Sequence, residues 1–260
     1  GRSTMTNQGS LSAWTGRVAL VTGASSGIGR AVAARLAHEG LNVAICARRE
    51  ERLNELAQQL ADAPGEILPV VCDLRHESQI LAMFETIRAR WAGGVDVRVN
   101  NAGLGFDAGL TNGETEAWRE MFDVNVLGLM VATREAVRDM RLTGDTGHVF
   151  HVSSLSGHRV PNGAFVYAAT KFAVRALTEG LRLELRNLDS NIRVTAISPG
   201  YVETEFAEIF HGDEERGRAT YRQYPVLQPA DIADSIAYAL STPEHVGIHD
   251  ILLRPIQQQT

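Results

Sequence analysis

The chain has 260 residues, of which 44% are hydrophobic and 22% charged, a composition typical of a soluble globular protein. Its net charge of -6 at pH 7 provides no basic surface for nucleic acid or for an anionic membrane. No stretch approaches the ~20 consecutive apolar residues that span a bilayer, so we expect a cytoplasmic protein without a membrane span.

The N-terminus, the cysteines and the histidines carry little functional signal. Residues Gly1 to Met5 resemble an expression remnant, and we predict a flexible leader over residues 1–16, followed by one domain over residues 17–260. Cys46 and Cys72 each lie in a short apolar run, which predicts buried, reduced thiols. The eight histidines show no metal-ligand spacing, so we predict no metal site.

From residue 17 onward, short apolar runs alternate with amphipathic stretches. The runs predict strands over residues 17–22, 42–47, 67–72, 95–99, 147–153, 192–197 and 250–253. The helical period predicts one helix that starts at residue 28 and a second helix, after the second strand, that ends near residue 60. It also predicts helices over residues 77–91, about 114–140, about 164–188 and 231–240. This alternation predicts a single α/β domain, a Rossmann-type, doubly wound, parallel seven-stranded sheet flanked by helices. Residues 201–228 are polar, irregular and rich in charge, and we expect them to form a substrate lid.

A glycine-rich turn, TGASSGIG over residues 22–29, connects the first strand to the first helix. A pyrophosphate can approach such a turn closely, and the free N–H groups of the helix N-terminus bind the anion. The spacing G-x-x-x-G-x-G differs from the commonest dinucleotide fingerprint. Its place between a strand and a helix nevertheless favours nucleotide binding.

Two arginines follow the second strand, where nicotinamide-binding proteins distinguish their two cofactors. NAD sites usually place an acidic residue about 20 positions after the glycines to bind the ribose 2′-hydroxyl. Here Arg48 and Arg49 occupy that region, and the preceding Ala47 is neutral. A basic pair suits a 2′-phosphate and therefore favours NADP, although solvated charges at a helix start are the alternative.

Ser154, Tyr167 and Lys171 form the candidate catalytic group. Tyr167 and Lys171 are four residues apart, so a helix places the phenol and the ammonium on one face. A phenol has a pKa of about 10, and an ammonium about 5 Å away favours the phenolate by about 3 kcal/mol. Ser154 ends the fifth strand, where its hydroxyl can lie beside the phenol. Such a group suits proton transfer to a carbonyl or from an alcohol, although a buried tyrosine near a solvated lysine is the alternative.

Two further polar stretches lie where ligands bind. The segment NNAG, residues 100–103, ends the fourth strand, at the edge where open α/β sheets bind their ligands, although a plain turn is the alternative. Asn125 lies in the middle of the helix predicted over residues 114–140, where asparagine is a poor helix former. We expect its side chain to face solvent or to bond locally to the backbone.

Together these motifs resemble the single-domain short-chain dehydrogenases/reductases. The segments TGASSGIG and NNAG, together with Asn125, Ser154, Tyr167-x-x-x-Lys171 and Pro199-Gly200, occur in the order and spacing of that family. The resemblance covers about residues 17–260. Segments such as SGHRV at 156–160 and PGYVET at 199–204 resemble a subgroup that acts on ketosteroids, α-dicarbonyls and terpenoid alcohols with NADP(H).

The resemblance implies a role for each matching position. Tyr167 would be the general acid/base, Ser154 would hydrogen-bond the substrate oxygen, and Lys171 would bind the nicotinamide ribose and lower the phenol pKa. Asn125 would distort its helix to hold a water molecule in the proton relay. The implied cofactor-binding residues are Gly23, Ser25, Ser26, Gly27, Ile28, Gly29, Arg48, Arg49, Asp73, Leu74, Asn101, Ala102, Gly103, Tyr167, Lys171, Pro199, Gly200, Val202 and Thr204. The implied substrate-binding residues are Ser154, Ser156, Tyr167 and Tyr201.

Four of the implied cofactor contacts are specific. Asp73 would contact adenine, Asn101 would steady the central strand, and Thr204 would bond the nicotinamide carboxamide. Arg48 matches the position that binds the 2′-phosphate. Some NADP-dependent members also carry a basic residue just before the second glycine, where this chain has Ser26, so the expected NADP preference rests on the arginines after the second strand.

We therefore expect an NADP(H)-dependent oxidoreductase that interconverts an apolar ketone or aldehyde and its alcohol. A 3-oxoacyl-carrier-protein reductase is the enzymatic alternative, but the acidic lid disfavours an acidic carrier protein. A catalytically silent NADP-sensing protein is the other alternative, although a sensor does not need the complete set Asn125, Ser154, Tyr167 and Lys171. The family resemblance further implies a homotetramer or homodimer formed through the two long helices, about 114–140 and 164–188.

Overall fold

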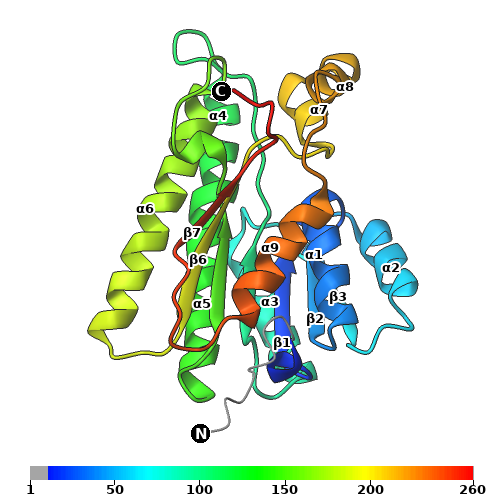
Figure 1. The fold of residues 1–260 in the computed structure, drawn as a ribbon, viewed down its shortest axis with the longest axis vertical. Coiled ribbons are helices and arrows are strands. Elements are labelled where there is room, and N and C mark those ends of the chain that lie inside the picture. The colour runs from blue at the N-terminus through cyan, green and yellow to red at the C-terminus, as the bar shows by residue number, and fades with distance from the viewer. Residues whose placement is uncertain (1–10, 260) are drawn as a thin grey trace, which may run out of the picture.

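The computed structural model describes residues 11–259, and all seven predicted strands form within two residues of their predicted bounds. The strands are β1 (Val18–Thr22), β2 (Asn42–Ala47), β3 (Ile67–Val71), β4 (Val97–Asn100), β5 (His148–Val152), β6 (Arg193–Pro199) and β7 (Asp250–Leu253). They pair in parallel in the order β3-β2-β1-β4-β5-β6-β7 (Figure 1). The order reverses between β1 and β4, which places a ligand-binding crevice at the carboxyl ends of these strands. The predicted doubly wound fold is confirmed.

Helices cover both faces of the sheet. The α-helices are α1 (Gly27–His38), α2 (Glu50–Gln59), α3 (Glu77–Arg90), α4 (Thr115–Phe122), α5 (Leu129–Leu142), α6 (Phe165–Asn187), α7 (Phe206–His211), α8 (Glu214–Arg222) and α9 (Pro229–Ser241). Helices α1, α2 and α9 pack on one face, with α1 beside α9, whereas α3, α5 and part of α6 pack on the other (Figure 1). None of the helices within residues 11–259 combines the length and apolar character that crossing a membrane requires.

The apolar strand residues form the two halves of the core. Val21 and Ile45 pack on the side of α1 and α9, and Leu20 and Cys46 pack on the side of α3 and α5. All five residues of β1 are buried, which explains why this strand is a continuous apolar run. Cys46 and Cys72 are buried and free, as predicted.

The start of the described chain is packed and does not behave as the predicted leader. Leu11 is 1% exposed, and a 3₁₀ helix, η1 (Ser12–Trp14), follows it. The indole Nε1 of Trp14 donates to the carbonyl of Leu240 at 3.0 Å. The prediction of a flexible leader is therefore wrong for residues 11–16, because two apolar side chains anchor them, and its first ten residues lie outside the described part of the chain.

Two segments differ from the predicted elements. The helix predicted over residues 114–140 consists of α4, a π-helical segment η2 (Asp123–Gly128), and α5. The lid, residues 201–228, was predicted to be irregular but contains α7 and α8. Gly212 ends α7 in the left-handed conformation at φ 61°, and the carboxylate of Asp213 caps α8 by accepting from the N–H of Arg216.

Candidate active site

Tyr167, Lys171 and Ser154 converge at the carboxyl end of β5. Tyr167 and Lys171 lie one turn apart on α6, and the Lys171 Nζ stands 5.7 Å from the centre of the phenol ring. The Nζ donates to the carbonyl of Val152 at 3.0 Å, which holds the ammonium against the end of the strand. Ser154 caps the short 3₁₀ helix η3 (Leu155–Gly157), because its Oγ accepts from the N–H of Ser156, and its hydroxyl hydrogen-bonds the phenol of Tyr167. The structure therefore brings the three predicted catalytic side chains together.

Burial controls the charge of this group. Burial lowers the pKa of Lys171 from 10.5 to about 8, so its ammonium is still mostly charged at neutral pH. Burial also raises the pKa of Tyr167 well above 10, although the hydrogen bond from Ser154 lowers it. The expectation that Lys171 is enough to lower the phenol pKa is thus wrong for the protein without ligand, because burial raises the pKa of Tyr167 more than the hydrogen bond from Ser154 lowers it. Lys171 is also the only lysine in the sequence.

Asn125 lies within the π-helical segment η2 and is 1% exposed. Its Nδ2 donates to the carbonyl of Leu104 at 2.7 Å and to Thr170 Oγ1 at 3.0 Å, and its Oδ1 accepts from the N–H of Leu104 at 2.9 Å. The prediction of a solvent-facing or locally bonded side chain is wrong, because the amide bonds a distant loop and α6. The widened π turn allows this amide to link the loop after β4 to the helix that carries Tyr167.

The glycine-rich turn has the geometry of an anion cradle. Gly23 and Gly27 have φ values of 66° and 51°, which glycine adopts without strain. A Cβ at Gly29 would overlap the carbonyl oxygen of Gly23, so α1 and β1 approach too closely for any other residue. Within residues 11–259, no side chain caps the start of α1, which leaves its N–H groups directed at the crevice. These features fit the phosphates of a dinucleotide.

The side chains around this turn are held in place by contacts with their neighbours. The Nδ2 of Asn101 donates to the carbonyl of Thr22 at 3.0 Å, which ties the end of β4 to the end of β1. The methyl group of Thr204 lies directly over the start of α1, where a Cβ at Gly27 would come within 2.9 Å of it. The carboxylate of Asp73 is bound by Arg75, and this hydrogen bond lowers the pKa of Asp73.

The two arginines after β2 occupy different positions. The side chain of Arg48 is 58% exposed and lies 3.9 Å from the carboxylate of Glu120. Arg49 instead folds back onto the glycine-rich turn, where its guanidinium donates to the hydroxyls of Ser25 and Ser26 at 2.8 and 3.0 Å. Both arginines line the cavity at the end where the glycine-rich turn lies, and their predicted role toward a phosphate stays a prediction.

One cavity of about 840 Å³ joins these groups. Every predicted cofactor-binding and substrate-binding residue lines this cavity, with the exception of Gly29. Every predicted catalytic residue also lines the cavity, with the exception of Asn125. Gly29 and Asn125 support the wall from behind through the contacts described above. The arrangement gives a long crevice with an anion cradle at one end and a proton-transfer group at the other.

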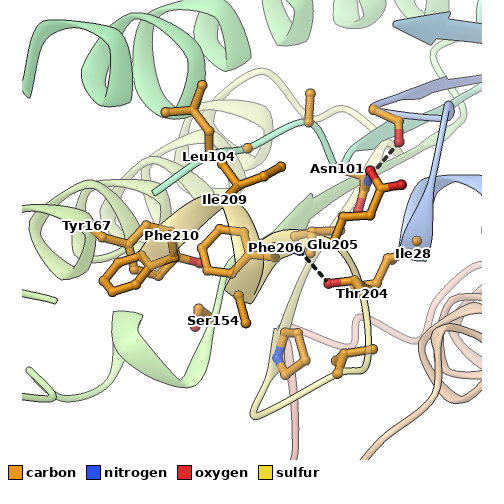
Figure 2. A pocket seen from close by; sticks show the side chains of 18 of the residues that line it. Ile28, Asn101, Leu104, Ser154, Tyr167, Thr204, Glu205, Phe206, Ile209 and Phe210 are labelled. Atoms are coloured by element: carbon orange, nitrogen blue, oxygen red, sulfur yellow. Dashed lines mark hydrogen bonds between the residues drawn. The ribbon is translucent and has the colours of Figure 1, made fainter. Parts of the chain in front are cut away.

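The sequence analysis missed the apolar walls of the cavity. Phe206 and Phe210 of α7 lie over Tyr167, with ring centres 5.2 and 6.2 Å from the phenol (Figure 2). Leu104 and Phe106, from the loop after β4, pack against the same cluster. The spacing of Phe206, Ile209 and Phe210 is that of one helix face and could have revealed an amphipathic helix in the lid. These residues give the substrate end of the cavity an apolar character.

Within residues 11–259, no three His, Cys, Asp or Glu side chains gather where they could hold a metal ion. His148 and His151 are both buried in β5, where His148 pairs with Thr195, and His151 pairs with Thr133 and Thr178. Burial lowers the pKa of both histidines, which therefore stay neutral inside the sheet.

Proton transfer at a phenol, in a cavity with room for a dinucleotide, is what a nicotinamide-dependent oxidoreductase of CH–OH groups requires. The chain belongs to the short-chain dehydrogenase family, whose model matches residues 17–215. The family predicted from the sequence motifs is therefore confirmed.

The relatives and the solved structures agree with this assignment. The chain is 50% identical to dehydrogenase/reductase SDR family member 11 of Bos taurus, over 95% of this chain and 99% of that protein. It is 38% identical to a farnesol dehydrogenase of Aedes aegypti, over 95% and 98% of the two chains. Among solved structures, the closed form of a serine dehydrogenase complexed with NADP+ superposes with a TM-score of 0.87 at 32% identity and covers 94% of this chain and 96% of that one.

Proposed function

We propose that this protein interconverts an apolar ketone or aldehyde and its alcohol with NADP(H), and that Tyr167 is the general acid/base. The observation that carries the proposal is the convergence of Ser154, Tyr167 and Lys171 beneath an aromatic lid, in the same cavity as the glycine-rich turn. A sensor of the cofactor needs only the turn, whereas this arrangement supplies a proton to a reacting oxygen. The reaction class follows from that geometry.

The chain's own residues would handle the proton and the substrate oxygen. Ser154 and Tyr167 would hold the carbonyl oxygen by hydrogen bonds, and the phenol would give up its proton as that oxygen gains negative charge. A nicotinamide, when bound, supplies or accepts the hydride, and its oxidised form carries a positive charge. Lys171 would stabilise the phenolate that remains and bind the nicotinamide ribose. Asn125, fixed by its three hydrogen bonds, would hold the water that returns a proton to the site.

The cofactor would lie along the sheet edge. The glycine-rich turn would hold its phosphates, Asp73 its adenine, and Thr204 its carboxamide. The choice of NADP over NAD rests on Arg48 and Arg49, because β2 is followed by two cations and no carboxylate where the 2′-hydroxyl of NAD would need one. The serine dehydrogenase structure is a complex with NADP+, which supports this choice.

The substrate would be apolar. Phe206, Phe210, Leu104 and Phe106 surround the phenol, so a long hydrocarbon or a ring system would bury its surface against them. The name of the Aedes aegypti relative, farnesol dehydrogenase, fits an alcohol of that kind.

The test is cofactor oxidation by the purified protein, with NADPH and with NADH, over ketosteroids, α-diketones, aliphatic aldehydes and farnesal. We expect turnover with at least one apolar carbonyl and a preference for NADPH of about tenfold or more, because the 2′-phosphate gains a charged contact. Equal rates with the two cofactors would contradict the role of the arginines. Binding of NADPH without turnover across the whole panel would contradict the enzymatic proposal.

We also propose that copies of this chain associate through the helical pair α4–α5 and through α6. Exposed apolar side chains lie along the stretch from α4 through η2 to α5, at Phe122, Leu127 and Met130. Others lie along α6, at Phe165, Phe172 and Leu183. Burying such a surface favours association. Light scattering should show a dimer or a tetramer, and a species of 28.3 kDa alone would contradict the proposal.

A further inference from the structure

Glu205, the residue just before the lid helix α7, lies between Arg49, which lines the cavity, and Arg52 of α2. Its Oε2 accepts from Arg49 Nη1 at 3.0 Å, and its Oε1 accepts from Arg52 Nη1 at 2.5 Å. Arg49 is the same side chain that donates to Ser25 and Ser26 on the glycine-rich turn. Figure 2 shows Glu205 beside Phe206, on the side of the cavity where Ile28 and Asn101 lie. One carboxylate thus connects the turn, α2 and the lid.

Two guanidinium groups that donate to one carboxylate form an anion-binding site, and the hydroxyls of Ser25 and Ser26 hold one of these guanidinium groups. A phosphate monoester uses the same donors, because guanidinium groups bind carboxylate and phosphate oxygens with the same planar fork. Partial burial alone would raise the pKa of Glu205, but the hydrogen bonds from Arg52 and Arg49 outweigh it and lower the pKa. Glu205 is therefore an anion at neutral pH, in a place that also suits the 2′-phosphate.

Resting on the proposed function, we infer that Glu205 is an internal anion that competes with the 2′-phosphate of NADP(H) for Arg49 and Arg52. Binding of the phosphate displaces the carboxylate, whereas NADH, which carries a 2′-hydroxyl, leaves it in place. Glu205 is then a specificity-determining residue that lowers the affinity for the phosphate and ties that affinity to the position of the lid.

The connection to the lid is direct. Glu205 precedes Phe206, whose N–H donates to Thr204 Oγ1 at 3.2 Å, and Phe206 and Phe210 cover Tyr167 (Figure 2). When the carboxylate leaves the arginines, the start of α7 loses its ionic contact with the turn and with α2. The aromatic cover over the phenol can then shift, so the phosphate at one end of the cavity affects substrate access at the other.

The first test measures binding of 2′,5′-ADP and of 5′-AMP by calorimetry to the wild type, to Glu205→Gln and to a control, Glu215→Gln. The control removes the same charge from an exposed position on α8. The three side chains of the ion pair are 38% to 43% exposed, so the expected gain is the modest one of a partly exposed pair. We expect Glu205→Gln to bind 2′,5′-ADP about threefold to fivefold more tightly, with 5′-AMP unchanged and the control unaffected for both ligands. Unchanged or weaker binding of 2′,5′-ADP by Glu205→Gln would overturn the inference.

A second variant separates competition from simple repulsion between the carboxylate and the phosphate. In the Arg49→Gln/Arg52→Gln background, Glu205 has no arginine to occupy. Adding Glu205→Gln to that background should leave the affinity for 2′,5′-ADP unchanged. A gain that persists there would show through-space repulsion and would overturn the competition.

The lid is followed through Trp118, which packs against the same apolar cluster as Phe206 and Phe210. A Trp14→Phe/Trp91→Phe background leaves Trp118 as the only tryptophan. We expect 2′,5′-ADP, but not 5′-AMP, to change its emission, and Glu205→Gln to show part of that change without ligand. An emission that responds equally to both ligands would overturn the coupling to the lid.

These outcomes are distinct from a failure of the proposed function. If neither 2′,5′-ADP nor NADPH binds to the wild type or to Glu205→Gln, NADP is the wrong cofactor and both proposals fail. If NADPH supports turnover but 2′,5′-ADP binds the two proteins equally, only the role of Glu205 fails.

Discussion

Replacing Lys171 by methionine should stabilise the fold while abolishing turnover. The Lys171 side chain is 5% exposed, it makes one hydrogen bond, to the carbonyl of Val152, and burial lowers its pKa from 10.5 to about 8. Since one pKa unit corresponds to about 1.4 kcal/mol, keeping this ammonium charged inside the fold costs about 3 kcal/mol at pH 7. Methionine fills similar space without the charge, and losing the bond to Val152 costs about 1 kcal/mol. The free energy of unfolding should therefore rise by about 2 kcal/mol.

The stability gained by Lys171→Met depends on pH. Between pH 8 and pH 10.5 the unfolded chain binds more protons at Lys171 than the folded chain, so the stability of the wild type rises with pH across that window. Below about pH 8 both states carry the proton, and the cost is constant. The advantage of Lys171→Met should consequently be largest below pH 8 and should shrink towards pH 10.5.

Two assays test this reasoning. Urea unfolding of the wild type and of Lys171→Met at pH 7 and pH 10 measures the difference in stability and its dependence on pH. Because Lys171 is the only lysine, carbon-13 labelling of lysine gives one side-chain NMR signal, whose titration reports its pKa without further assignment. A midpoint near pH 8 is expected. A midpoint above pH 10, or a variant less stable than the wild type at pH 7, would refute the reasoning.

Three further substitutions test the cradle, the π turn and the aromatic cover. Gly29→Ala should weaken NADPH binding at least about tenfold in a fluorescence titration, because the added methyl meets backbone atoms that cannot yield, and normal affinity would contradict the cradle. Asn125→Ala should lower the free energy of unfolding by about 2–3 kcal/mol, because it leaves both backbone groups of Leu104 without their amide partner. Urea unfolding measures this change, and a decrease of less than about 0.5 kcal/mol would contradict the role of the amide. Phe206→Ala should raise the KM for an apolar carbonyl by about tenfold, because it removes a ring packed on Tyr167. The KM for a small polar ketone should change little, and an equal rise for the two substrates would contradict an apolar site.

The features that the sequence predicted correctly depend on local spacing. The turn at residues 22–29 lies between a strand and a helix, and both of these elements follow from periodic apolar residues. Tyr167 and Lys171 are one helical turn apart, and Ser154 comes two residues after the end of β5, so the fold brings them together once the sheet order is known. For the same reason, all seven strands were found.

The features that were missed depend on contacts between distant parts of the chain. The family resemblance implied a distorted helix at Asn125, and the π-helical segment η2 agrees with it, but no local pattern identifies the partners of the amide, Leu104 and Thr170. Burial decides the pKa of Tyr167, and spacing alone does not reveal how deeply a phenol is buried. In the lid, the many acidic residues favoured the prediction of an irregular polar segment. The helix face formed by Phe206, Ile209 and Phe210 was therefore not predicted.

Arg98 is a further example of a tertiary effect. Its side chain is 0% exposed within β4, where it donates to the carbonyls of Leu20 and Val99 and to Thr22 Oγ1. Burial lowers its pKa to about 10. The sequence predicted the strand correctly, but an arginine in a strand is usually at the surface, and only the packing shows that this one is buried.

Turnover by a Tyr167→Phe variant isolates the role of the phenol. The substitution removes one oxygen and keeps the ring that packs against Phe206 and Phe210, and Tyr238→Phe, at an exposed position on α9, is the matched control. With NADPH and a carbonyl that the wild type reduces, we expect the rate of Tyr167→Phe to fall by about 10²–10⁴-fold, with the control unchanged and NADPH affinity preserved. A Tyr167→Phe rate close to that of the wild type would contradict the assignment of Tyr167 as the general acid/base.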